Sequence, residues 1–252
     1  MKALRNPAGC RTLFGAFIVL LLWYILHICV RSNILPGPYE TFVTFAKLMT
    51  GPLLPHVAIS IYRIAAAIVV SMGIGVPLGL WLGLSERADS VISPVVYILY
   101  PIPKVAFLPL FMILFGLGNS SKIILIISII VFQTVLTARD GVKEIPGELY
   151  ASVRTLGLNR WQIYKHLVFP AALPKIFSAL RVSIGVSIAT LFFGENFATT
   201  YGVGYFIMNC WVMADYEQMF AGILAMSLMG IFIFKAIDLL ERKVCPWICL
   251  HN

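Results

Sequence analysis

Six long apolar stretches, each close to the length of a membrane-crossing helix, constrain the fold of this chain more than any other feature. A helix needs about 20 mostly apolar residues to cross the ~30 Å hydrocarbon core of a bilayer. The stretches that meet this requirement are 13–30, 64–84, 95–115, 123–138, 176–194 and 220–239. The fourth is short and is expected to start nearer Asn119. The sequence therefore predicts an all-α polytopic membrane protein with six transmembrane helices.

The composition excludes a soluble protein. Of the 252 residues, 60% are hydrophobic and 12% are charged, whereas about 25% of the residues in a soluble domain are charged. Such a chain cannot cover a globular surface with solvated side chains, so we do not expect a soluble enzyme. The net charge of +8 does not call for nucleic acid either, because basic cytoplasmic loops of a membrane protein give the same excess.

The distribution of Lys and Arg predicts that both termini lie in the cytoplasm. With that orientation the inner segments hold twelve Lys and Arg residues and the outer loops hold three, which is the bias that membrane proteins show. We expect four parts. They are a cytoplasmic tail with the first crossing (1–30), a periplasmic segment (31–63), a five-helix core (64–240) that includes a cytoplasmic loop (139–175), and a cytoplasmic tail (241–252).

Prolines interrupt the third stretch. Pro101 and Pro103 each remove a backbone donor and disturb the preceding turn. In a membrane such breaks are tolerated where protein or a water-filled cavity satisfies the freed carbonyl groups. The segment 100–104 is therefore a candidate for lining or gating a transport pathway, with a kink that serves packing alone as the alternative.

Polar side chains within the stretches are further pathway candidates, since an ionisable residue at mid-membrane costs on the order of 3 kcal/mol unless it faces protein or water. Arg181 is the deepest base of the fifth stretch and could pair with an anionic substrate or snorkel to the inner interface. Glu195 lies at the outer end of that stretch. Gln133 and Thr134 could line the pathway or bond to a neighbouring helix.

The inner segment 139–175 is predicted to hold two short helices. Pro146 and Glu148 are typical of a helix start, and Gly157 is typical of the residue that follows a helix end. Apolar residues lie on one face of this first helix: Leu149, Val153 and Leu156.

Asn159 is placed to cap the second of these helices, and Pro170 and Pro174 are expected to stop it. Two short helices that meet at a glycine on the basic side of a membrane bundle predict one of two structures. They form either a docking element for a partner or a loop that lies on the bilayer.

The same loop carries a family resemblance. Nine residues separate Ala151-Ser-Val-Arg-Thr-Leu-Gly157 from Leu167-Val-Phe-Pro170. This pattern resembles the EAA loop of bacterial ABC importer permeases, with the glycine and the proline in register. The stretches 154–162 and 169–174 are similar to the nitrate/sulfonate/taurine branch. Further pieces agree, including Ser60-x-x-Arg63 and Glu195 ahead of Gly202-Val-Gly-Tyr205. The family usually has Glu where this chain has Ala151, although Glu148 lies one helical turn earlier.

The resemblance implies a type I importer permease of the bacterial inner membrane. Two copies would form the pore, a cytoplasmic ABC ATPase dimer would bind ATP and Mg, and a soluble binding protein would deliver a small anion such as nitrate, a sulfonate or taurine. The coupling helix would contact the ATPase through residues of the cytoplasmic loop: Glu148, Ala151, Ser152, Arg154, Thr155, Leu156, Gly157 and Arg160. The sequence has no GxxxxGK[ST] phosphate loop, so we expect no catalysis and no cofactor on this chain.

Two other classes are the alternatives. A secondary transporter would work without an ATPase, and it would be expected to show repeated halves with paired broken helices, which this sequence lacks. A membrane-embedded enzyme would need a nucleophile, a base or a metal site. The four histidines are scattered and no HExxH or GxSxG motif is present, so we expect no metal site.

Overall fold

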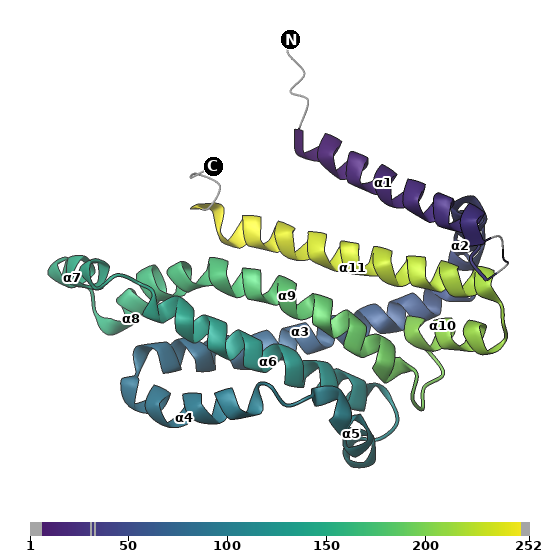
Figure 1. The fold of residues 1–252 in the computed structure, drawn as a ribbon. Helices are drawn as coiled ribbons and strands as arrows, with labels where there is room; N and C mark the ends of the chain where they lie inside the picture. The colour runs from purple at the N-terminus through teal and green to yellow at the C-terminus, as the bar shows by residue number, and fades with distance from the viewer. Residues whose placement is uncertain (1–6, 31, 33, 248–252) are drawn as a thin grey trace, which may run out of the picture.

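The computed structural model describes residues 7–30, 32 and 34–247, with side chains from Phe14 onward. All regular elements in these residues are helices (Figure 1). The α-helices are α1 (Pro7–Val30), α2 (Pro38–Met49), α3 (Leu53–Leu84), α4 (Glu86–Leu99), α5 (Leu108–Phe115), α6 (Asn119–Lys143), α7 (Gly147–Thr155), α8 (Arg160–Ile163), α9 (Phe169–Glu195), α10 (Val203–Val212) and α11 (Tyr216–Val244). A 3₁₀ turn, η1 (Lys104–Phe107), precedes α5, and a π-helical turn, η2 (Tyr164–Val168), joins α8 to α9.

Four helical runs in the described residues are long and apolar enough to cross a membrane, and each contains a predicted stretch. They are Leu53–Leu84, Asn119–Lys143, Arg160–Glu195 and Tyr216–Val244. The start of α6 at Asn119 is the start that the short fourth stretch suggested. The first stretch lies in α1, whose described apolar part, Phe14–Val30, is shorter than these four.

The third predicted stretch, 95–115, is broken where its prolines interrupt it. In the structure α4 ends at Leu99 and α5 starts at Leu108, and the two helices are bent by 80° relative to each other. Pro101 and Pro103 explain the break, because each lacks the N–H of a helical bond and disfavours helical geometry in the residue before it. Together α4 and α5 form a fifth candidate span that is broken in its middle.

The expected stop at Pro170 and Pro174 is also wrong. The chain runs as one helical span from Arg160 to Glu195, with a π-turn at Tyr164–Val168. That turn shifts the hydrogen-bond register, so that Pro170 falls in the first turn of α9, where no intrahelical N–H is needed. Pro174 then lies inside α9, which continues through it.

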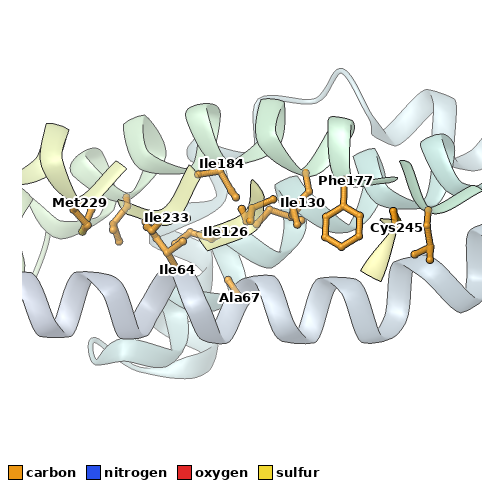
Figure 2. Close-up of a cluster of buried hydrophobic side chains, with 13 residues drawn as sticks. Ile64, Ala67, Ile126, Ile130, Phe177, Ile184, Met229, Ile233 and Cys245 are labelled. Carbon is orange, nitrogen blue, oxygen red and sulfur yellow. The ribbon is translucent and has the colours of Figure 1, made fainter. Parts of the chain in front are cut away.

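The long helices pack side by side through small residues and a shared apolar core. A Cβ atom added at Gly79 of α3 would lie 2.5 Å from the carbonyl oxygen of Val135 on α6, so these two helices approach closely, as small residues allow in membranes. Buried side chains from α3, α6, α9 and α11, including Ile64, Ile130 and Ile184, form a cluster along the bundle (Figure 2).

The two ends of the bundle are built differently. Helices α7 and α8 lie at one end, together with the C-terminal end of α11, and α2 and α10 lie at the other (Figure 1). Helix α3 begins at Leu53, well before the predicted stretch at 64. Its first turns carry Ser60 and Arg63, whose polar side chains are buried in the protein, so this part of the helix is not recognisable as an apolar stretch. Helix α10 was not expected from the sequence.

Candidate functional site

A cavity of about 380 Å³ lies where the broken span meets α6 and α9. The segment between α4 and η1 contributes Tyr100, Ile102 and Pro103, and α6 contributes Gln133. Helix α9 contributes several residues: Val182, Ser183, Val186 and Thr190. Ligand cavities usually have volumes of roughly 300–1,000 Å³, so this one is large enough for a small solute.

Lys104 satisfies the backbone at the break. Where α4 ends, its last carbonyl groups have no helical partner. The Lys104 ammonium accordingly donates to the carbonyl oxygens of Leu99, Tyr100 (2.9 Å) and Ile102 (3.0 Å). It also lies 4.9 Å from the centre of the Phe132 ring on α6. One partly exposed cation thereby stabilises the broken backbone and puts positive charge beside the cavity.

Two of the six pathway candidates, Pro103 and Gln133, line this cavity. Gln133 accepts a hydrogen bond from the Tyr100 hydroxyl through Oε1. Pro101 precedes the lining residues without being one of them. Thr134 is buried, donates to the carbonyl oxygen of Ile130 (2.8 Å), and lies against Gly75 of α3, so it serves the packing of two helices.

Arg181 does not face the cavity. Its Nε donates to Asp238 at 2.8 Å, and its Nη2 pairs with Glu241, both on α11. The guanidinium charge is therefore already partnered by two carboxylates, which ties α9 to α11. The expectation that Arg181 pairs with an anionic substrate receives no support from these contacts.

Glu195 is fully buried at the end of α9 and does not line the cavity. Its carboxylate accepts from Arg63 Nη1 (2.6 Å), from Ser60 Oγ (2.7 Å) and from the backbone N–H of Gly204 (2.8 Å). The pathway role expected for Glu195 therefore has no geometric basis here; instead its carboxylate joins α3 to the loop that leads into α10.

Arg63 extends this network to α6 and to the same loop. Its Nε and Nη2 donate to Asn119 Oδ1 at 2.9 and 2.8 Å, and Nη1 also donates to the carbonyl oxygen of Tyr201 at 2.9 Å. Lys122 lies nearby, also buried, and donates to the carbonyl oxygens of Leu117 (2.6 Å) and Ala198 (3.3 Å). The result is a polar network at the end of the bundle that carries α10, with its charged members Arg63, Lys122 and Glu195 buried.

The loop between α6 and α9 forms the two helices that the sequence predicts. Helix α7 ends at Thr155, and Gly157 has φ +75°, a left-handed conformation that glycine adopts without strain. Asn159 caps α8: its Oδ1 accepts from the backbone N–H of Gln162 (2.9 Å), while Gln162 Oε1 accepts from the backbone N–H of Asn159 (2.8 Å).

One side of this elbow, which we define as residues 147–163, is anchored on the bundle. Tyr150 and Ile163 pack against a core cluster that includes Leu80 of α3 and Val142 of α6. This partial burial raises the pKa of the Tyr150 hydroxyl. The anchored side fixes the direction of the elbow relative to α3 and α6.

The other side of the elbow is exposed. Leu149 is 47% exposed and Leu156 is 75% exposed, although both belong to the apolar face expected from the sequence. All residues that the sequence assigned to ATPase contact are exposed as well: Glu148, Ala151, Ser152, Arg154, Thr155, Leu156, Gly157 and Arg160.

A second set of ion pairs, missed in the sequence, lies at this end. Arg139 of α6 bonds to Asp140 (2.6 Å) and approaches Asp89 of α4 (3.4 Å), and Lys143 also pairs with Asp89. Arg139 Nη2 donates to the Tyr97 hydroxyl at 2.7 Å. These contacts hold the first half of the broken span to the helix that leads into the elbow.

Residues 75–245 match the family described as "Binding-protein-dependent transport system inner membrane component". The match includes the cavity, the elbow and α9 to α11. The chain belongs to this family of importer permeases. In the part of the chain that the structure describes, no group of three or more His, Cys, Asp or Glu side chains is placed to hold a metal ion.

Individual relatives agree over nearly the whole permease. It is 30% identical to the putative aliphatic sulfonates transport permease protein SsuC of Bacillus subtilis (strain 168), over 98% of this chain and 87% of that protein. It is 31% identical to the taurine transport system permease protein TauC of Escherichia coli (strain K12), over 92% and 88% of the two chains.

A solved structure shares the fold. A chain of the inward-facing MetNI methionine ABC transporter superposes on the permease with a TM-score of 0.66 and 19% identity, covering 78% of this chain and 97% of that one. At that identity the likeness shows the fold alone. The permease is therefore a multi-pass membrane protein with the helical architecture of ABC importer permeases.

Proposed function

We propose that this permease pairs with a second copy to form the membrane pathway of an importer for a small sulfonate, driven by a cytoplasmic ABC ATPase dimer. In this proposal both termini and the elbow (147–163) lie in the cytoplasm of a bacterium, and a soluble binding protein delivers the substrate at the end that carries α2 and α10. ATP and Mg belong to the ATPase.

The observation that carries the proposal is the elbow, anchored on one side and exposed on the other. Leu156, at 75% exposure, presents a large apolar side chain beside the left-handed Gly157. Leu149 and Trp161 of the elbow are exposed as well, and exposed apolar residues that gather on one element are typical of an interaction site. Family membership supports an ATPase as its partner, and the exposed residues Arg154 and Arg160 add charge for polar contacts at the rim.

The substrate class rests on the relatives. Two of the matching relatives are named for sulfonate compounds, aliphatic sulfonates for one and taurine for the other, and another is named for nitrate. A sulfonate is a fixed anion, and the positive charge of Lys104 beside the cavity suits such a cargo. Nitrate is the competing anion to be tested beside it.

Site-specific crosslinking of the intact transporter tests the proposed contact. Leu156→Cys, in a cysteine-free permease purified with its ATPase and binding protein, is expected to crosslink to the ATPase. The matched control is Thr50→Cys at the exposed end of α2, on the opposite side of the bundle (Figure 1). Crosslinks from position 50 and none from position 156 would overturn the orientation and the docking.

Uptake by proteoliposomes tests the cargo and the energy source. The reconstituted complex is expected to accumulate taurine or an alkanesulfonate only with ATP on the ATPase side. ATP-independent accumulation would favour a secondary transporter. Accumulation of nitrate and of no sulfonate would overturn the substrate assignment while leaving the importer intact.

A further inference from the structure

The cavity at the broken span has an unusual set of polar atoms for a site among membrane-spanning helices. Ser183 of α9 is 3% exposed, and its Oγ has no hydrogen-bond partner among the described residues. Burying a hydroxyl without a partner is unfavourable. Ser183 lines the cavity, so a ligand in the cavity is within reach as the missing partner.

Two further groups line the same space. Thr190, nearly two turns further along α9, brings a second hydroxyl to the lining. Gln133 of α6 accepts from the Tyr100 hydroxyl through its amide oxygen, and its two N–H donors are available to a ligand. Together with Ser183, these residues offer donors from two helices.

The charge of the cavity is of one sign. Among its described lining residues Lys104 is the only charged one. The Lys104 ammonium already donates to three carbonyl groups, so it acts on a ligand through its field and not as a free donor. Positive charge beside a mostly apolar lining, with hydroxyl and amide donors and no carboxylate, favours an anion.

The cavity also lies at the depth where a transported solute must pass. Gln133 is within two residues of the midpoint of α6, Asn119–Lys143, and Ser183 is within one residue of the midpoint of α9, Phe169–Glu195. Both helices are long enough to cross the membrane. A site at mid-helix is therefore near the middle of the bilayer, where an anion needs compensating groups most.

We propose that Ser183, Thr190 and Gln133 form an intramembrane binding site for the sulfonate group of the cargo, with Lys104 supplying the positive field. This inference deepens the proposed function and rests on it. It gives the permease its own contact with the oxyanion, separate from the contact made by the binding protein. Arg181, for which the sequence left substrate pairing and snorkelling as alternatives, links α9 to α11.

The first experiment measures charge selectivity at Ser183. Ser183→Cys, in the cysteine-free permease within the complete transporter, is treated with 2-sulfonatoethyl methanethiosulfonate, which is itself an alkylsulfonate, and with the trimethylammonium analogue of the same chain length. The ratio of the two rates is normalised to Thr50→Cys at the exposed end of α2. We expect the anionic reagent to be favoured by about tenfold or more, and an alkanesulfonate to slow its reaction.

Substitution of Lys104 separates charge from structure. Lys104→Gln in the Ser183→Cys background is expected to abolish the preference, and Lys104→Arg to keep it, because arginine retains both charge and donors for the carbonyl groups at the break. Equal rates for the two reagents in the parent, or no reaction at position 183 in a transporter that is turning over, would overturn the site.

The second experiment uses a matched pair of serines. Ser71 of α3 is also buried with an unpartnered Oγ, but it does not line this cavity. We expect Ser183→Ala to raise the KM for sulfonate uptake by about tenfold, and Ser71→Ala to leave KM unchanged. Equal effects on KM would assign Ser183 to packing and overturn the proposal.

The proposed function and the intramembrane site can be disproved separately. If the wild-type complex imports no sulfonate, the proposed function fails. If the wild type imports a sulfonate but Ser183→Ala keeps the parental KM and Ser183→Cys shows no charge preference, only the intramembrane site fails.

Discussion

Arg63 on α3 and Glu195 at the end of α9 form an ion pair of 2.6 Å whose side chains are 2% and 0% exposed. The two residues are 132 positions apart in the sequence, and the pair holds the loop before α10 against the first turns of α3. Taking two charges out of water is costly unless each is paired and hydrogen-bonded, and here Ser60, Asn119 and Gly204 supply the additional bonds.

Removal of one partner of this pair is expected to destabilise the permease strongly. Arg63→Met leaves the Glu195 carboxylate buried without its cation, which costs roughly 3–5 kcal/mol. Thermal unfolding of the purified protein in detergent measures the loss. Lys175→Met is the control, because it breaks the pair with Glu144 at the surface, where an exposed pair contributes about 0–1 kcal/mol. Similar losses of stability in the two variants would show that the buried pair stabilises the protein no more than the surface pair does.

Gly202 is expected to tolerate no side chain. Its φ is +146°, and an added Cβ would lie 2.6 Å from both carboxylate oxygens of Glu195. Gly202→Ala therefore strains the backbone and pushes on the buried pair, which we expect to lower the stability by about 2 kcal/mol or more. Gly185→Ala is the control, because that helical position has open space around it. Equal melting temperatures for the two variants would contradict this account.

The elements that the sequence predicts well are those set by local chemistry. The long apolar runs specify four of the spans, and Asn159 with Gln162 specifies the start of α8 through a capping box. Gly157 takes the left-handed conformation that its place between two helices requires. In each case the residues that decide the structure are neighbours in the chain.

The remaining features depend on contacts between distant residues or on backbone adjustments that have no local signal. Pro170 looks like a helix stop, yet the π-turn before it keeps the helix continuous. The break near Pro101 is predictable, but the 80° between α4 and α5 is not. Arg181 and Glu195 are visible as charged residues within apolar stretches, while their partners, Asp238 and Arg63, follow only from the packing of the helices.

Two glycines of α3 are expected to respond oppositely to alanine. At Gly79 an added Cβ would lie 2.5 Å from the carbonyl oxygen of Val135 on α6, whereas Gly73 has nothing within 4 Å. Gly79→Ala should force α3 and α6 apart at a cost of about 1–3 kcal/mol. Gly73→Ala should be neutral or stabilise by up to about 1 kcal/mol, because alanine favours helix more than glycine does. Thermal unfolding in detergent compares the two variants. Equal destabilisation by both would show that the close approach of α6 to Gly79 does not set the cost.

Substitution of Gly157 is expected to uncouple transport from ATP hydrolysis without unfolding the permease. Gly157 has φ +75° and open space around it. Gly157→Asp therefore adds a negative charge at the proposed ATPase contact, in a backbone conformation that Asp and Asn tolerate alike, and leaves the core unaffected. We expect normal membrane insertion and at least about a tenfold loss of ATP-driven uptake, since a coupled contact of 1.4 kcal/mol already gives that factor. Gly157→Asn is the control, because Asn tolerates the left-handed conformation and carries no charge. Uptake at the parental rate by Gly157→Asp would show that the elbow does not couple the permease to ATP hydrolysis. Equal loss of uptake in both variants would show that glycine itself is required at this position.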